Sequence, residues 1–350
     1  MPSSGPGRIL LLVVLGWAAG VAANAADGPD IRFLDLERGR VAIVDDSDDP
    51  YFALLQQQEI GAKTDAAMPN GAMSWQRNAC RSRFQDAVRT FTPEEQAAIT
   101  RVITSIYPVL AQRFPLVAKV PWRFIKLERR FEGDTAHTRG HCIVLSAGVM
   151  RVFQRDPGYG FDESDAFLLL NEQLHIIERF NRPLFVPLFA QRWGFIHMEE
   201  PPALSGQLRD HQYLDPDSIT RDWLYPVPVG SATMLIQPQI FLRSTSAVPK
   251  LPEDRDFVAL GVEAHAGGYR YLVGAGGEIA MYELSTVTPY LAAFAPCTEL
   301  ISPNDIAAEL FADLVIALSR ATAPPSTPLM DGFSTWAQSP QGFGRPAPAP

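Results

Sequence analysis

The segment from Leu168 to Arg179 constrains this chain more than any other stretch. It reads LLLNEQLHIIER, an apolar run interrupted by polar residues at helical spacing. At about 100° per residue, the polar side chains fall within an arc of about 120° on one side of a helix. They are Asn171, Glu172, His175, Glu178 and Arg179. Such a helix fits two environments equally well: the floor of a cleft, or a core position with one polar edge in solvent.

Residues 1–25 predict a secretory signal peptide. Arg8 precedes an apolar run that ends near Ala19, and the small residues that a signal peptidase requires follow at 23–25. Ala26 is then the first mature residue. The run is shorter than the roughly 20 residues of a membrane span. We therefore expect a secreted or periplasmic protein with no integral membrane span in the mature chain.

Charge and length limit what the mature chain can be. The 350 residues carry a formal net charge of -9 and contain no basic cluster, which argues against nucleic acid and anionic membranes as partners. The length suits one domain over residues 26–320. Residues 321–350 are rich in Pro, Ala, Gly and Ser and predict a flexible tail.

Two further helices are predicted by their capping residues. Thr92, Pro93 and Glu95 form a capping box ahead of apolar residues at helical spacing. Ser302 precedes Pro303 and an equally apolar segment, so a last helix is expected there. We expect this helix and the one around 168–179 to face each other across a cleft.

Strands are expected between these helices. Residues 122–127 and 141–146 alternate in a way typical of β-structure and predict a small antiparallel sheet. Residues 183–255, rich in proline and aromatic side chains, predict long ordered loops with short helices, and 268–283 predict a hairpin around a glycine-rich turn. The expected fold class is α+β: a helical core with a small sheet.

Histidine and cysteine residues offer alternative sites. His137 and His141 lie four apart, but in a strand and turn they need not face one site, and surface or hydrogen-bonding roles are favoured. Cys80, Cys142 and Cys297 are widely spaced, so no zinc-finger pattern exists and two of them can pair in an oxidising compartment.

The segment Asn171 to His175 resembles the active helix of the H-E-x-x-H zinc metallopeptidases, with asparagine in place of the first histidine. It is similar to uncharacterised exported bacterial members of that family. The likeness extends to the stretch 137–140 and to the start of the last helix at 302–309. It covers about residues 120–320, and only the central motif is specific.

This resemblance implies a gluzincin-like fold and a zinc site. Glu172 would be the general base that takes a proton from metal-bound water, and His175 a zinc ligand. Asp305 falls on the position of the third ligand, and Glu309 on that of a second-shell residue supporting a zinc-binding histidine. Asn171 and Asp305 depart from the family pattern, in which histidine and glutamate stand there. Both departures weaken the predicted metal site.

Two functions follow as hypotheses. The first is an exported metallopeptidase that hydrolyses peptide bonds through a zinc-activated water, with Glu172 as base and with Asn171, His175 and Asp305 around the metal. The alternative is a catalytically inactive pseudopeptidase whose cleft binds a peptide or protein partner. A third interpretation is that the motif is coincidental.

Overall fold

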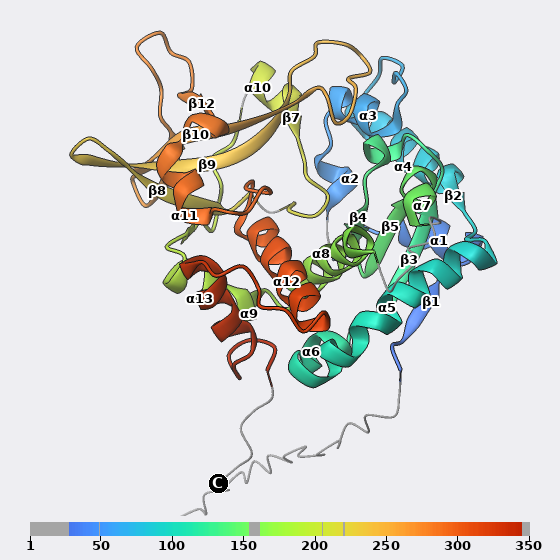
Figure 1. Ribbon diagram of the computed structural model, residues 1–350. Helices are drawn as coiled ribbons and strands as arrows, with labels where there is room; N and C mark the ends of the chain where they lie inside the picture. Colours follow the sequence, from blue (N-terminus) through green and yellow to red (C-terminus); the bar gives the residue numbers. More distant parts are fainter. Residues whose placement is uncertain (1–27, 49, 154–161, 205, 220, 345–350) are drawn as a thin grey trace, which may run out of the picture.

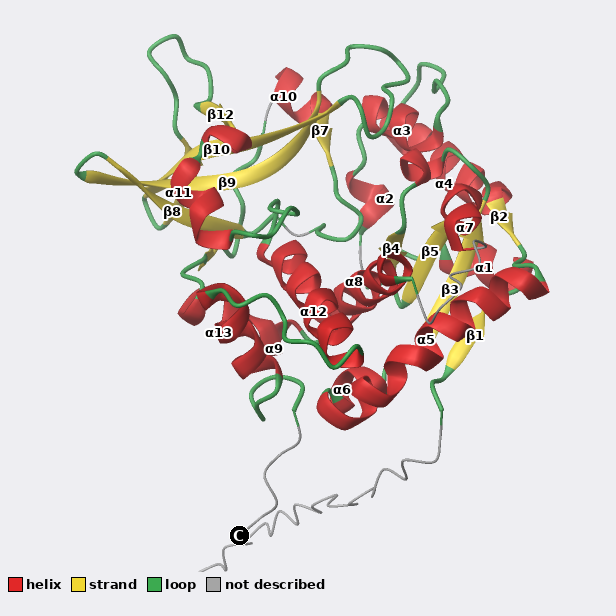
Figure 2. Cartoon of the chain, viewed as in Figure 1, coloured by secondary structure: helices red, strands yellow, loops and turns green. Residues whose placement is uncertain are grey.

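The computed structural model describes residues 28–48, 50–153, 162–204, 206–219 and 221–344. The predicted signal peptide and the predicted first mature residue, Ala26, lie outside these ranges. The described chain combines helices with two β-sheets, which confirms the α+β class (Figures 1 and 2).

The first sheet is mixed rather than antiparallel. Its strands are β1 (Ile31–Phe33), β2 (Val88–Arg89), β3 (Trp122–Leu127), β4 (His137–Arg139) and β5 (Cys142–Ser146). β3 pairs in parallel with both β1 and β5, whereas β2 and β4 pair antiparallel to their neighbours. The predicted antiparallel pairing of 122–127 with 141–146 is therefore wrong. Between them the chain turns through the 3₁₀ helix η1 (Phe131–Asp134) and β4, and this extra reversal makes β5 parallel to β3.

Helices cover both faces of this sheet. Trp122 and Phe124 of β3 join a core that includes α5 and α8, while Ile125 and Leu127 join a second core beneath the N-terminal helices. Alternate residues of a strand point to opposite faces, so β3 supplies both cores. The N-terminal helices are α1 (Leu36–Ala42), α2 (Tyr51–Leu54), α3 (Gln57–Thr64) and α4 (Met73–Ala87).

The predicted capped helices are present. α5 (Pro93–Arg113) begins with the expected capping box between Thr92 and Glu95 and continues through Pro108. α8 (Glu163–Phe180) carries the motif, and α12 (Pro303–Ser319) begins with a capping box at Ser302. α8 and α12 pack directly against each other at the centre of the molecule.

The second sheet is the largest feature that the sequence analysis missed. It is antiparallel and contains β6 (Ile196–His197), β7 (Gln212–Tyr213), β8 (Trp223–Val229), β9 (Ala232–Leu242), β10 (Arg255–His265), β11 (Gly268–Tyr271) and β12 (Met281–Glu283). Its long strands β8, β9 and β10 curl above α12 and α13 in Figure 2.

The loop prediction for 183–255 is wrong because prolines there are tolerated inside strands. Pro226 and Pro228 lie in β8 beyond its short pairing with β6, where β8 is an edge strand. A proline cannot donate a ladder hydrogen bond, and an unpaired edge does not require one. The predicted hairpin at 268–283 is half right: β11 and β12 both pair with β10, and only the bridge Val273–Ile279 joins the two arms.

Shorter helices lie between these elements along the chain. They are α6 (Pro115–Ala118), α7 (Ala147–Phe153), α9 (Arg182–Pro187), the π-helix η2 (Leu188–Arg192), α10 (Gly206–His211), the 3₁₀ helix η3 (Leu284–Thr286) and α11 (Thr288–Phe294). Cys80, Cys142 and Cys297 are all buried free thiols.

The C-terminal segment is packed, which contradicts the predicted flexible tail over residues 328–344. α13 (Pro328–Ala337) buries Phe333 and Trp336, and Phe343 follows them into the main core. Trp336 contacts the rings of Phe185 and Phe343 at centroid distances of 5.5 and 5.0 Å. The flexible tail was predicted from the overall Pro and Ala content, which gave no weight to these aromatic residues at helical spacing.

Replacing Trp336 with alanine should destabilise the protein by about 3–5 kcal/mol, because the change leaves a cavity among aromatic side chains. Urea unfolding measures this difference. Trp75→Ala is the matched control, since Trp75 is 49% exposed and its loss should change little. Equal effects of the two substitutions would contradict a packed C-terminal segment.

Candidate functional site

The polar stripe of α8 is buried rather than exposed. Asn171 and Glu172 are each 6% exposed and His175 is 3% exposed, while Glu178 is also buried. The helix begins at the cap Asp162, whose side chain accepts a hydrogen bond from the backbone N–H of Ser164. The spacing allowed two environments for this helix, and the one with a polar edge in solvent is therefore excluded.

Three stripe residues and Asp305 line one cavity of about 390 Å³. Five side chains around it are carboxylates, and we call it the acidic cavity. They are Glu172, Asp215, Asp217, Glu299 and Asp305. Arg255 also lines it and lies over the rings of Tyr213 and Phe257, at 6.0 and 5.6 Å from their centroids.

Burial and mutual repulsion alter the acidity of these groups. Burial, followed by the nearby charge of Asp217, raises the pKa of Glu172 well above its usual value. Burial and Asp215 raise the pKa of Asp217 to about 6, and the same two causes raise that of Asp305. Oε2 of Glu172 is buried and has no hydrogen-bond partner among the described residues. Burial and mutual repulsion therefore both favour the protonated forms of these carboxyl groups.

His175 is oriented by a neighbour one turn along the same helix. Its Nδ1 lies 3.2 Å from Oε2 of Glu178. Burial raises the pKa of Glu178 to about 7, and the hydrogen bond to His175 opposes that rise. A carboxylate on one ring nitrogen fixes the orientation of an imidazole and leaves the other nitrogen for a ligand.

The two residues predicted on α12 have other hydrogen bonds. Oδ2 of Asp305 accepts the backbone N–H of Ser302 at 2.9 Å, which closes the capping box. Glu309 accepts the backbone N–H groups of Thr298 and Glu299, at 2.8 and 2.9 Å, and does not line the cavity. In the described structure Glu309 holds the loop that carries Glu299, and no histidine contacts it.

The donor set suits a zinc ion poorly. Asn171 offers an amide and donates from Nδ2 to Glu299 at 3.4 Å, which leaves His175 as the single nitrogen ligand. Across the described ranges, no group of three or more His, Cys, Asp and Glu side chains is placed to hold a metal ion. Zinc sites need three or four converging ligands. The zinc site stays a prediction.

Asp215 and Asp217 were absent from the sequence prediction because they follow β7 in a segment predicted to be loop. The local signal was the pair of carboxylates around Pro216. Oδ1 of Asp217 accepts the backbone N–H and the hydroxyl of Thr138, at 2.6 and 2.7 Å. Arg179 donates to Thr138 and to the carbonyl of Pro216. The stripe residue Arg179 thus helps to position the acidic segment.

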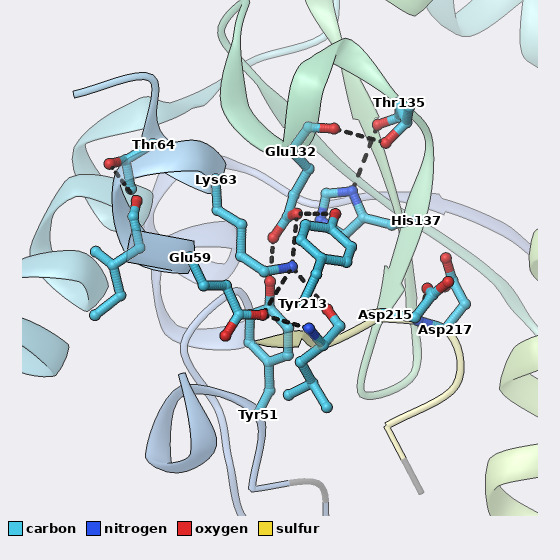
Figure 3. Close-up of polar contacts among 12 residues, drawn as sticks. Tyr51, Glu59, Lys63, Thr64, Glu132, Thr135, His137, Tyr213, Asp215 and Asp217 are labelled. Carbon is cyan, nitrogen blue, oxygen red and sulfur yellow. Dashed lines mark hydrogen bonds and ion pairs between the residues drawn. The ribbon is translucent and has the colours of Figure 1, made fainter. Parts of the chain in front are cut away.

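A buried ion network holds the start of that segment (Figure 3). Nζ of Lys63 on α3 lies 3.0 Å from Oε2 of Glu132 and donates to the carbonyl of Leu214 at 2.8 Å. Glu59 accepts the backbone N–H of Leu214 at 2.6 Å. Both polar atoms of the Leu214 backbone are therefore bound by side chains of α3, directly before Asp215.

The remaining histidine candidates lie apart from each other. His137 is buried beside the Lys63 network, and burial lowers its pKa, so it is neutral at physiological pH. His141 is half-exposed and stacks on Phe180 with centroids 3.5 Å apart. Neither lines the acidic cavity, so neither replaces Asn171 as a metal ligand there.

Comparison of the chain with protein-family models, with curated proteins and with solved structures finds no match in any of the three. The helices of the described part are all too short or too polar to cross a membrane.

The raised carboxyl pKa values give a pH-dependence of stability. Folded protein keeps protons on Glu172 that the unfolded chain releases above a pH of about 4, so this contribution to stability is lost as pH rises. Glu172→Gln should make the fall in unfolding free energy between about pH 5 and pH 8 shallower. Urea unfolding at several pH values measures the slope.

Glu37→Gln is the control for that experiment, because Glu37 is exposed on α1 far along the chain from the cavity. It should keep the wild-type slope. A Glu172→Gln slope equal to that of wild type would show that Glu172 is ionised in the folded protein.

Proposed function

We propose that this chain is a metallopeptidase-like binding protein whose acidic cavity receives a lysine or arginine side chain of a peptide or protein partner. The observation that carries the proposal is the convergence of five carboxylates on one cavity, one of which, Glu172, has an oxygen free of any partner in the described residues. The proposal includes a secreted or periplasmic location.

Electrostatics support a cationic ligand. Like charges held together in a poorly solvated site favour the protonated form, and an entering cation removes that penalty. Arg255 is the only lining side chain among the described residues with a permanent positive charge, against five carboxylates. A bound ligand cation would therefore balance the negative charge of the carboxylates and favour release of protons from the carboxyl groups.

The shape and the apolar part of the lining support a long side chain. Much of the remaining lining is hydrophobic: Ile240, Phe257, Leu284, Leu291, Leu300 and Ile301. Lysine and arginine carry a charged head on a flexible apolar stem, which packs on hydrophobic surface. A cavity of about 390 Å³ has room for such a side chain.

Hydrolysis is the weaker candidate on these observations. The general base of this reaction takes a proton from a metal-bound water, and the residues around Glu172 offer the metal a single nitrogen ligand, because Asn171 presents an amide that donates to Glu299. If zinc were bound, it would supply an acidified water molecule, and Asn171, His175 and Asp305 are the residues that would hold it. Their poor fit favours binding over catalysis.

The test uses isothermal titration with an acetylated and amidated glycine–lysine–glycine peptide. We expect binding accompanied by proton release near pH 7, so the measured heat should change with the ionisation enthalpy of the buffer. The same peptide with norleucine in place of lysine should not bind. Glu172→Gln should weaken lysine-peptide binding about tenfold or more, while Glu37→Gln should not.

Two outcomes would overturn the proposal. One is equal affinity for the lysine and norleucine peptides. The other is stoichiometric zinc in protein purified without chelator, lost on His175→Ala and accompanied by peptide hydrolysis.

A further inference from the structure

A second cavity, of about 690 Å³, shares lining residues with the acidic cavity. We call it the arginine cavity. His175 and Asp217 line both cavities, so these two side chains form part of the boundary between them. Trp223, Gln239 and Tyr271 of the large sheet contribute to its wall. The two cavities are therefore neighbours that share part of their lining.

Four arginines and five carboxylates line the arginine cavity, and three of the arginines have partners. Arg179 donates to the carbonyls of Gly140 and Pro216. Arg182 forms an ion pair with Asp222, and Arg209 lies 3.6 Å from Asp210. These three guanidinium groups are already compensated by the protein.

Arg221 differs from them. Its guanidinium makes no hydrogen bond and no ion pair with any described residue, although the side chain is only partly exposed. Burial lowers its pKa, and the carboxylate of Glu59 acts on it only from a distance. A desolvated cation without a partner is costly, and a planar guanidinium presents donors suited to a carboxylate.

Arg221 also lies close to the acidic segment. A gap of about 20 Å³ is bordered by both Arg221 and Asp215, and by Ser218 between them in sequence. The short chain from Asp215 to Arg221 thus carries acidic groups at one end and a free cation at the other. This places an anion-binding group beside a cation-binding cavity.

We propose that Arg221 binds a carboxylate of the same ligand whose basic side chain enters the acidic cavity. The preferred ligand is then a peptide segment with a lysine or arginine next to a carboxylate, supplied either by an acidic side chain or by a chain terminus. This inference rests on the proposed function and names the second charge that the ligand carries.

The experiment extends the titration series with three acetylated peptides. Glycine–lysine–glutamate with an amidated end offers a side-chain carboxylate, and glycine–lysine–glycine with a free end offers a terminal one. Glycine–lysine–glutamine with an amidated end is the neutral isostere. We expect at least one carboxylate peptide to bind about tenfold or more tightly than the isostere. The stronger of the two identifies the source of the carboxylate.

Arg221→Gln should abolish that gain while leaving the affinity for the neutral isostere unchanged. Arg221→Lys keeps the charge without the planar fork and should retain part of the gain. Arg243→Gln is the matched control, because Arg243 is 62% exposed, is paired with Asp256 and lines neither cavity, and it should keep the full gain.

Failure of this inference is distinguishable from failure of the proposed function. If the lysine peptides bind but neither carboxylate improves affinity, or if the gain survives in Arg221→Gln, the role of Arg221 is overturned and the acidic cavity stands. If glycine–norleucine–glutamate binds as tightly as its lysine counterpart, in an Arg221-dependent way, the anion site stands and the cation site is overturned.

Discussion

The contact between Lys63 and the backbone of Leu214 joins the two halves of this fold. Lys63 is fully buried, and its charge is balanced by Glu132, which also accepts hydrogen bonds from Tyr51 and Tyr213. A buried ion pair contributes little net stability, but losing one partner costs about 3–5 kcal/mol. The arrangement therefore enforces one position for the chain after β7. That position brings Asp215 and Asp217 to the motif helix.

The consequence is a site that brings acidic side chains together without an equal number of basic ones. α8 supplies Glu172 and His175, α12 supplies Asp305, and the segment after β7 supplies two further carboxylates. Burial and mutual repulsion raise the pKa values of Glu172, Asp217 and Asp305, which favours their protonated forms when no cation is near. A cation and protons then compete for the same oxygens, so ligand binding and proton release are thermodynamically linked.

Local sequence signals predicted the parts of this site that lie on helices. Capping boxes marked the starts of α5 and α12, and the polar stripe marked α8, because these signals involve residues three or four apart. Contacts between distant segments determine the other features. These features are the directions of the strands in the first sheet, the proline-bearing strands of the second sheet and the packing of Trp336. The pairing of Lys63 with Leu214 spans 151 positions, and no local pattern encodes it.

For the site, too, the sequence predicted only the residues that lie on helices. Glu172, predicted as the general base, lines one cavity with the predicted metal ligands His175, Asn171 and Asp305. These roles stay predictions, and Glu309 holds a loop. The residues that give the cavity its acidity came from a segment without a recognisable motif. The polar stripe located the helix, and only the assembled charges suggested a cationic ligand.

Carbon-13 NMR of the glutamate side-chain carboxyls tests the central claim most directly, with Glu172→Gln used to assign the Glu172 signal. The account predicts that Glu172 is protonated at pH 7 in the free protein and becomes ionised when the glycine–lysine–glycine peptide is added. A carboxylate signal for Glu172 at pH 7 before any ligand is present would contradict it.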